Sequence, residues 1–413
     1  MSDVRTAMVI GGGIAGPVAA LALRKAGIEA TVYEAYTGTA DGVGGTLGIA
    51  PNGLNALRVV DAADVVLDIG DPVSSMVIES WTGKRLAEFG GQGGPPVFHA
   101  VWRADLYRAM YDKAVGRGVP VLHGKRLVSA SSSESGVVAR FADGTTASAD
   151  ILVAADGIRS TVRSIVDSAA PPPRYTGLLG FGSRPSVDLN AGLDSTAGSM
   201  HMSFGKRAFF AYQVAADGST GWFANLPWRE RLSLGQTRSI GAPVWLRELR
   251  SAFAGDRTPA PAILDRVSPS ELIMTGALED LPTVPTWSRG RMVLIGDAAH
   301  ATSPSSGQGA SIAVESAVQL ARCLRDLPTV SDAFRAYEQL RRERVERIIA
   351  SGKRTSSEKA AGPIARIVRD AVMPVTMKLL AKPEKMEWQY NYRINWNAPV
   401  QSATGSALTS TNA

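Results

Sequence analysis

Three stretches of this chain place glycines and acidic residues where a predicted strand gives way to a helix. The first, Gly11-x-Gly13-x-x-Gly16, follows the apolar run TAMVI and opens a run with helical spacing. There the backbone N–H groups and the positive end of the helix dipole can bind a pyrophosphate. Gly11 permits the tight turn, Gly13 the close approach of a phosphate, and Gly16 close packing of helix on strand.

Glu34 extends this pattern to a nucleoside. It ends a second predicted strand over residues 29–35, near the spacing of about 20 residues at which a carboxylate binds a ribose diol. An acid here disfavours a 2′-phosphate, so the bound adenosine is expected to resemble that of FAD or NAD rather than NADP. The alternative is a structural turn with a surface glutamate.

The second and third stretches have the same character. "ADGIRSTVR" (155–163) follows a predicted strand and carries Asp156 at the strand end. In "IGDAAHATSPSSGQGAS" (295–311), Asp297 is expected to end a buried strand, where it can accept a hydrogen bond from a ribityl hydroxyl. Gly307 and Gly309 would expose N–H groups at a helix start. Such groups can face an acceptor that becomes more negative on reduction, as a flavin pyrimidine edge does.

Composition narrows the class of protein. A chain of 413 residues, 45% hydrophobic and 20% charged, predicts a globular protein of two or three domains. No run approaches the roughly 18 apolar residues of a membrane span, and the N-terminus does not resemble a signal peptide, so a cytoplasmic location is expected. Cys323, the single cysteine, excludes a disulfide within the chain and is expected to be buried in a helix.

The net charge of +6 raises the possibility of nucleic-acid binding. The basic residues concentrate in "RAYEQLRRERVERIIASGKR" (335–354), where acidic residues alternate with them. This pattern predicts a solvated helix face with i,i+4 ion pairs, not a nucleic-acid patch.

The order of predicted elements indicates an α/β protein with an insertion. A βαβ unit opens the chain, and an aromatic-rich segment of alternating strands occupies about 174–275. The strand "RMVLIGD" and a long helical region then return to the first pattern. We predict a discontinuous nucleotide-binding domain (1–72, 98–173 and 276–375), a substrate-binding sheet domain (73–97 and 174–275), and a C-terminal helix and tail (376–413).

Together, the three motifs resemble those of the single-component (class A) FAD-dependent monooxygenases, the aromatic hydroxylase family that includes para-hydroxybenzoate and salicylate hydroxylases. The resemblance extends from Val4 to about Trp396 and includes "WRADLY", in which Arg103 matches an arginine that reaches FAD. It implies a Rossmann-like FAD-binding domain of the glutathione-reductase type, a mostly antiparallel substrate sheet, and tight, non-covalent FAD. The residues implied to contact FAD are Gly11, Gly13, Ile14, Ala15, Gly16, Glu34, Ala35, Gly45, Arg103, Leu127, Asp156, Gly296, Asp297, Pro304, Gly307, Gly309, Ala310 and Ser311.

The resemblance also implies the reaction. NAD(P)H would bind transiently and reduce FAD, and the reduced flavin would react with O2 to give a C4a-hydroperoxide. This species would transfer one oxygen atom to a hydrophobic, electron-rich aromatic or polycyclic substrate, by hydroxylation or epoxidation, as in natural-product tailoring. Pro304 would face the oxygen-reacting side of the ring. We expect a monomer or homodimer with no nucleic-acid partner and no stable membrane association.

The inserted strands supply the predicted substrate pocket, with Phe210, Tyr212, Trp222 and Asn225 as its residues. His201 and Tyr212 could meet a substrate hydroxyl, although a packed or solvated side chain is the simpler interpretation, and no catalytic base is assigned. The chain departs from the family at Ser311, where relatives often have Asn, and at Glu315-Ser316, where many have Glu-Asp.

Three alternative functions fit part of this pattern. A flavin-dependent halogenase usually carries Trp-x-Trp-x-Ile-Pro, whereas the nearest stretch here, "WFANLP", lacks the second tryptophan. A flavin reductase or oxidase would share the first motif without adding oxygen to a substrate. A non-enzymatic flavin-binding protein would require the substrate and reductant sites to be vestigial.

Overall fold

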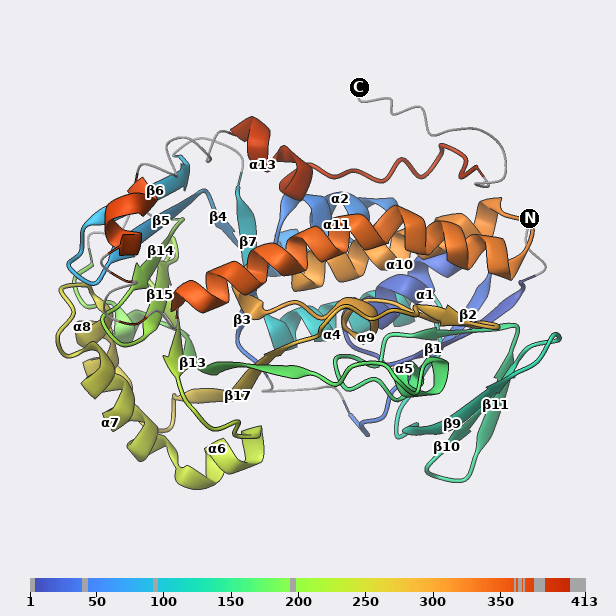
Figure 1. The fold of residues 1–413 in the computed structure, drawn as a ribbon, viewed down its shortest axis with the longest axis horizontal. Helices are drawn as coiled ribbons and strands as arrows, with labels where there is room; N and C mark the ends of the chain where they lie inside the picture. The colour runs from blue at the N-terminus through green and yellow to red at the C-terminus, as the bar shows by residue number, and fades with distance from the viewer. Residues whose placement is uncertain are drawn as a thin grey trace.

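The computed structural model describes residues 4–38, 44–91, 96–193, 198–359, 362, 366, 368–374 and 383–401, so much of the predicted C-terminal tail lies outside the described residues. These residues form a six-stranded and a seven-stranded sheet, with two three-stranded sheets beside them. In Figure 1 the helix α11 runs along α10 and continues as far as β15 of the seven-stranded sheet. The predicted fold class, an α/β nucleotide-binding architecture with an inserted sheet, is confirmed.

The six-stranded sheet is built from strands that are far apart in the sequence. Its strand order is β18 (Ser288–Arg289), β19 (Met292–Leu294), β12 (Ile151–Ala154), β1 (Thr6–Ile10), β2 (Glu29–Tyr33) and β8 (Val121–Leu122). The pairs β19–β12, β12–β1, β1–β2 and β2–β8 are parallel, and β18 is antiparallel to β19. Short, continuous apolar strands suit a sheet that is covered on both faces.

Helices cover this sheet and extend its core. They are α1 (Ala15–Lys25), α2 (Pro51–Val59), α3 (Ala63–Ile69), α4 (Arg103–Gly116), α5 (Thr161–Val166), α9 (Asp297–His300), α10 (Gly309–Asp326) and α11 (Val330–Lys359), with α13 (Pro383–Tyr390) near the C-terminus. Cys323 is buried in α10, as expected, and burial raises the pKa of its thiol to about 12. No helix among the described residues is long and apolar enough to cross a membrane.

The seven-stranded sheet contains the inserted, aromatic-rich strands. Its order is β17 (Ile273–Asp280), β13 (Arg174–Ser186), β16 (Thr220–Pro227), β15 (Phe209–Val214), β14 (Ser199–Phe204), β5 (Ser75–Ser80) and β6 (Arg85–Gly90). One face packs into an apolar core with α7 (Ala242–Phe253) and α8 (Ala260–Arg266), and α6 (Leu234–Ile240) lies next to β17. Figure 1 shows α7 and α8 on the outer side of this sheet.

Segments between these elements form the two smaller sheets. One consists of β3 (Thr46–Ile49), β7 (Phe98–Trp102) and β4 (Asp71–Val73), and the other of β9 (Leu127–Ser132), β10 (Val137–Phe141) and β11 (Thr146–Ala149). Two short 3-10 helices complete the described structure, η1 (Val187–Leu189) and η2 (Pro304–Ser306). The strand β3 lies in a glycine-rich stretch of the chain. It forms because β7 supplies backbone partners from Ala100 and its neighbours.

Candidate active site

The glycine loop after β1 has the conformation that its spacing predicts. Gly11 adopts φ +103°, and a Cβ on it would overlap the Ala155 carbonyl; a Cβ on Gly16 would overlap the carbonyl of Gly11. Both positions therefore exclude side chains. A Cβ on Gly13, in contrast, would meet no protein atom within 4 Å. The loop thus leaves space beside the N-terminus of α1, where a phosphate is predicted to bind.

Glu34 lies directly against this loop. Its carboxylate accepts a hydrogen bond from the Gly12 backbone N–H at 2.7 Å and another from the Tyr36 N–H at 2.8 Å, and the residue is buried. A carboxylate has about four acceptor positions, so two remain for a ligand hydroxyl. Glu34 therefore shapes the loop and has two acceptor positions left for the predicted ribose contact.

The second motif holds two neighbouring loops together. Asp156 accepts hydrogen bonds from the Ser160 hydroxyl and the Val162 N–H, and burial raises the pKa of its carboxyl. Arg163, which is buried, donates to the Ile158 carbonyl at 2.7 Å and to the Ala298 carbonyl at 3.1 Å. Because β12 and β19 are parallel neighbours, this arginine joins the loop after β12 to α9, which follows β19.

Asp297 does not end a strand, contrary to the sequence prediction. β19 ends at Leu294, and Asp297 is the first residue of the short helix α9, after Gly296 with φ +55°. The side chain of Asp297 reaches solvent although the residues on both sides are buried. Protein atoms nevertheless surround the carboxyl closely enough for desolvation to raise its pKa, an effect that the positive charge of Arg103 partly opposes.

Arg103 links two more of the predicted positions. It begins α4, its backbone N–H donates to the Gly45 carbonyl at 3.1 Å, and its side chain is exposed. A Cβ on Gly44, which adopts φ +109°, would overlap the Arg103 side chain. Asp297, Gly45 and Arg103 thus come together from three separate parts of the sequence.

The stretch from Pro304 to Ser311 approaches this region from α10. Pro304 begins η2 and is exposed, as is Gly307 in the left-handed conformation at the end of η2. Gly309 opens α10, so its first-turn N–H groups are available for an acceptor. Ser311 is different: its hydroxyl accepts from the Ala50 N–H at 3.1 Å, and it lies against α2. Any contact between Ser311 and a cofactor would therefore involve its backbone.

The other predicted contact residues are divided between surface and core. Leu127 is buried in the main core, and Gly296 is buried as well, so a contact of either residue with a cofactor would involve its backbone or an apolar surface. The remaining predicted positions are partly exposed, namely Ile14, Ala15, Ala35 and Ala310.

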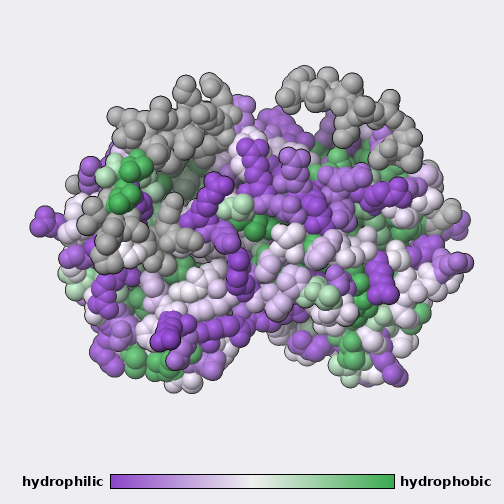
Figure 2. All heavy atoms as spheres, in the orientation of Figure 1, coloured by the Kyte–Doolittle hydropathy of each residue, from purple (hydrophilic) through white to green (hydrophobic). Residues whose placement is uncertain are grey.

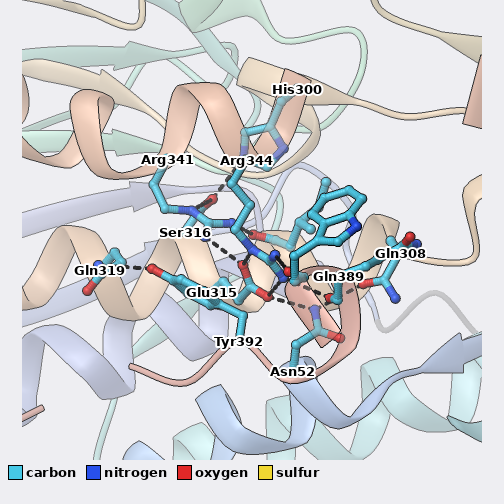
Figure 3. Close-up of polar contacts among 12 residues, drawn as sticks. Asn52, His300, Gln308, Glu315, Ser316, Gln319, Arg341, Arg344, Gln389 and Tyr392 are labelled. Carbon is cyan, nitrogen blue, oxygen red and sulfur yellow. Dashed lines mark hydrogen bonds and ion pairs between the residues drawn. The ribbon is translucent and has the colours of Figure 1, made fainter. Parts of the chain in front are cut away.

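A buried charge cluster, which the sequence did not reveal, lies behind this region (Figure 3). The Glu315 carboxylate on α10 pairs with Arg341 at 2.6 Å and Arg344 at 2.8 Å, and it accepts from the Asn52 amide at 2.6 Å. Glu315 and Arg341 have no exposed side-chain area. The prediction that the basic stretch is a solvated helix face is therefore wrong for Arg341 and Arg344, although Arg342 forms the expected i,i+4 pairs on that helix.

The same cluster connects α10 with α9 and the C-terminal segment. Ser316 bonds His300 Nε2 at 2.9 Å and accepts from Arg341 at 3.2 Å. Burial, followed by the charge of Arg341, lowers the pKa of His300 to about 3, so this histidine is neutral at pH 7. Arg344 donates to the carbonyls of Trp388 and Gln389 and lies over the Tyr392 ring (Figure 3).

The seven-stranded sheet requires a correction to the predicted pocket. Phe210, Tyr212 and Trp222 project from the face that packs against α7 and α8, where Phe210 stacks on Trp222 at 5.4 Å. His201 is on this face too, stacked on Tyr212 at 4.9 Å and 3.4 Å from the Glu79 carboxylate. These side chains do not line a pocket on the other face. Alternation predicts which residues share a face, but both faces of these strands are apolar.

The opposite face of the sheet, which we call the substrate face, has Asn225 and a set of apolar side chains. Directly paired residues project to the same side, which places Phe209 with Asn225, and Phe223 with Ala211, on this face. The pairs on β14 extend it, and its apolar members are Met200, Met202, Phe204, Phe209, Ala211 and Phe223. Met200, Met202 and Phe223 pack with Val73, Phe98 and Ala100 of the β3–β7–β4 sheet. The substrate face therefore adjoins the sheet that leads to Gly45 and Arg103.

Comparisons with known proteins agree with this arrangement. Residues 3–181 and 281–351 match the FAD binding domain family. A 3-amino-4-hydroxybenzoate 2-monooxygenase of Streptomyces platensis is 32% identical, over 95% of this chain and 97% of its own. Salicylate hydroxylase of Pseudomonas putida is 29% identical, over 94% and 92%. The structure of Klebsiella pneumoniae HpxO with FAD and uric acid superposes with a TM-score of 0.78 at 26% identity, covering 91% of this chain and 94% of that one.

The family match leaves out residues 182–280, which hold most of the inserted strands, and includes all three glycine and aspartate motifs, while the relatives extend across the insertion as well. The chain therefore belongs to the FAD-binding domain family, and it is an FAD-dependent monooxygenase of the aromatic hydroxylase class.

Proposed function

We propose that the chain uses NADH or NADPH, together with O2, to insert one oxygen atom into a hydrophobic, electron-rich aromatic or polycyclic small molecule, as natural-product tailoring enzymes do. The observation that carries this proposal is the substrate face, on which Met202, Phe209 and Phe223 form an apolar surface that adjoins the predicted flavin-binding residues. An aromatic ring is the ligand that such a surface favours. The names of two relatives, which specify salicylate and an aminohydroxybenzoate, also support an aromatic substrate.

The described residues fit FAD at both of its ends. The open position at Gly13 and the two free acceptor positions of Glu34 suit the pyrophosphate and the adenosine ribose. Asp297 presents a solvent-accessible carboxyl group to a ribityl hydroxyl, and the first-turn N–H groups of α10, which begins at Gly309, suit the pyrimidine edge of the ring. The Gly307 N–H donates to the Pro304 carbonyl at 3.1 Å instead. When bound, FAD supplies the electron transfer and the activation of oxygen.

The residues of the chain then have three tasks. The glycine loop and the first turn of α10 hold negative charge with backbone dipoles that are already oriented. Arg163 keeps the loop after β12 fixed relative to Asp297 through the Ala298 carbonyl. The apolar side chains of the substrate face hold the ring and exclude water from it. His201 and Tyr212, on the other face, are not proposed to move a proton.

The test is NAD(P)H consumption by the purified, FAD-loaded protein with a panel of substituted benzoates, phenols and polycyclic phenols. Stimulated consumption and a product heavier by one oxygen atom would support the proposal. Stimulated consumption that yields only hydrogen peroxide would indicate an oxidase, and a halogenated product formed with added halide would indicate a halogenase. If neither nucleotide reduces the bound flavin with any ligand, the proposal fails.

A further inference from the structure

Two positively charged side chains from distant parts of the sequence lie on the substrate face. Arg369 lies 4.4 Å from the centre of the Phe204 ring and pairs with Asp370, and the second is Lys359. Lys359 is the last residue of α11, and its ammonium group donates to the Asn225 Oδ1 at 2.8 Å. The Nζ atom lies 3.8 Å from the centre of the Phe209 ring and 5.9 Å from that of Phe223. In Figure 1, α11 ends beside β15, which agrees with these contacts. Lys359 therefore places a cation directly on the apolar surface proposed to hold the substrate.

This ammonium group has more donors than partners. It carries three N–H bonds, and among the described residues Asn225 supplies the hydrogen-bond acceptor, while no described carboxylate forms an ion pair with it. The following described segment contributes Arg366, Arg369 and Asp370, and Arg369 pairs with Asp370 at 2.6 Å. The ring faces of Phe209 and Phe223 attract a cation, but they offer no strong hydrogen-bond acceptor.

Lys359 is half-buried. Even partial burial of a cation without a counter-charge has a free-energy cost, because the charged form loses hydration. This desolvation lowers the pKa of Lys359 to about 7, and no charged group contributes to the shift. A surface lysine would avoid this cost by extending into water. The position of Lys359 is explained if a ligand supplies the missing negative charge and accepts the remaining hydrogen bonds.

We propose that Lys359 binds an anionic oxygen of the aromatic substrate, a carboxylate or a phenolate, and that Asn225 holds the ammonium group in place over the Phe209 ring. This inference rests on the proposed function and narrows its substrate class to aryl oxyanions. A charged hydrogen bond in a partly desolvated site contributes enough free energy to dominate the choice among ligands that share one ring system.

The experiment measures binding by titration calorimetry to the FAD-loaded protein at pH 7, without reductant. The probes are 2-naphthoate, 2-naphthol and the neutral 2-naphthamide, with benzoate, phenol and benzamide as the smaller set. We expect the wild type to bind an acid or a phenol more tightly than the matched amide. The tighter of the two identifies whether Lys359 receives a carboxylate or a phenolate.

Lys359→Met should remove this preference by raising the Kd of the favoured anion on the order of 10- to 100-fold, with little change for the amide. Asn225→Asp should have the same effect while the lysine remains, because its carboxylate would pair with the ammonium group. Arg354→Met is the matched control, since Arg354 is an exposed cation on the same helix, and it should leave all three Kd values unchanged. Thermal unfolding of each variant verifies that it is folded.

The proposal is overturned if Lys359→Met retains the preference of the wild type, or if the wild type binds no aryl anion of the panel more tightly than the amide. Failure of the proposed function gives a different result. In that case 2-naphthoate or 2-naphthol would bind in a Lys359-dependent manner, yet no aromatic ligand would stimulate NAD(P)H consumption or yield an oxygenated product.

Discussion

Replacement of Glu315 by Gln should destabilise the fold more than any exposed charge change on the same helices. The Glu315 carboxylate lies between two guanidinium groups, with Arg341 at 2.6 Å and Arg344 at 2.8 Å. Arg341 has no exposed side-chain area, and Arg344 has 10%. The substitution leaves both cations buried without a counter-charge, and it directs an amide N–H₂ group toward one of them.

The expected loss follows from this burial. Removal of one member of a buried, hydrogen-bonded ion pair destabilises a protein by about 3–5 kcal/mol, because the remaining charge cannot recover its hydration. The same loss would be a large part of a typical stability of about 5–15 kcal/mol. It should also weaken the attachment of α13, because Arg344 donates to the carbonyls of Trp388 and Gln389.

The pH dependence has a definite sign. Burial alone would raise the pKa of Glu315, but the charges of Arg341 and Arg344 together bring it below its ordinary value of 4.5. A carboxyl with a lowered pKa stabilises the fold above its unfolded pKa, and this contribution is lost as the pH falls through the folded value. The stability difference between wild type and Glu315→Gln should therefore be constant above about pH 5 and decrease below it.

Urea unfolding followed by tryptophan fluorescence measures both effects. Glu338→Gln provides the control, since Glu338 forms an i,i+4 pair with Arg342 on α11 and is 28% exposed; it should cost no more than about 0.5 kcal/mol. A loss of stability in Glu315→Gln no larger than that in Glu338→Gln, or a difference from wild type that increased toward low pH, would contradict the stabilising role of these buried ion pairs.

Three other predictions concern the cofactor and substrate surfaces. Gly16→Ala should weaken FAD binding by at least about tenfold, or roughly 1.4 kcal/mol, because a Cβ at this position overlaps the Gly11 carbonyl. A flavin fluorescence titration measures the Kd of FAD, and an unchanged Kd would contradict the prediction. Arg163→Met should lower the free energy of unfolding by about 2 kcal/mol and weaken FAD binding, because the carbonyls of Ile158 and Ala298 lose their hydrogen-bond donor. Arg354→Met, which replaces an exposed arginine, is the control and should change neither quantity. The Kd of 2-naphthoate should rise with pH above about 7 in the wild type, by up to about tenfold per unit, because Lys359 loses its proton there; Lys359→Met should show no such rise.

The sequence predicted the nucleotide-binding half of the site because its constraints are local. Gly11 and Gly16 are required by the backbone of a single turn, and Glu34 follows at a spacing that one βαβ unit determines. The paired parallel strands then bring Asp156 and Asp297 to one edge of the sheet. The sequence did not predict the start of α9, because β19 already ends at Leu294 and Gly296 adopts φ +55° just before the helix begins.

The substrate half depended on information that local sequence does not contain. Phe209 and Phe210 are both large, aromatic and buried, so alternation alone could not identify the face that α7 covers. The contact between Lys359 and Asn225 could not be predicted from the sequence, because the two residues are 134 positions apart and Lys359 lies at the end of a largely polar helix. Glu315-Ser316 appeared only as a departure from the family, whereas its partners Arg341 and Arg344 resembled surface residues.

The two halves of the site are joined by one pair of helices. The first turn of α10 provides the N–H groups proposed for the flavin, and its Glu315 bonds Arg344 of α11. From Arg344 the same helix continues for 15 residues to Lys359, a distance of about 22 Å at 1.5 Å per residue. Because a helix of this length resists compression along its axis, the Glu315 ion pairs set the position of Lys359 relative to the flavin edge. Glu315→Gln should accordingly weaken 2-naphthoate binding in protein that is still folded. Glu338→Gln, which changes an exposed charge on α11, should leave this binding unchanged.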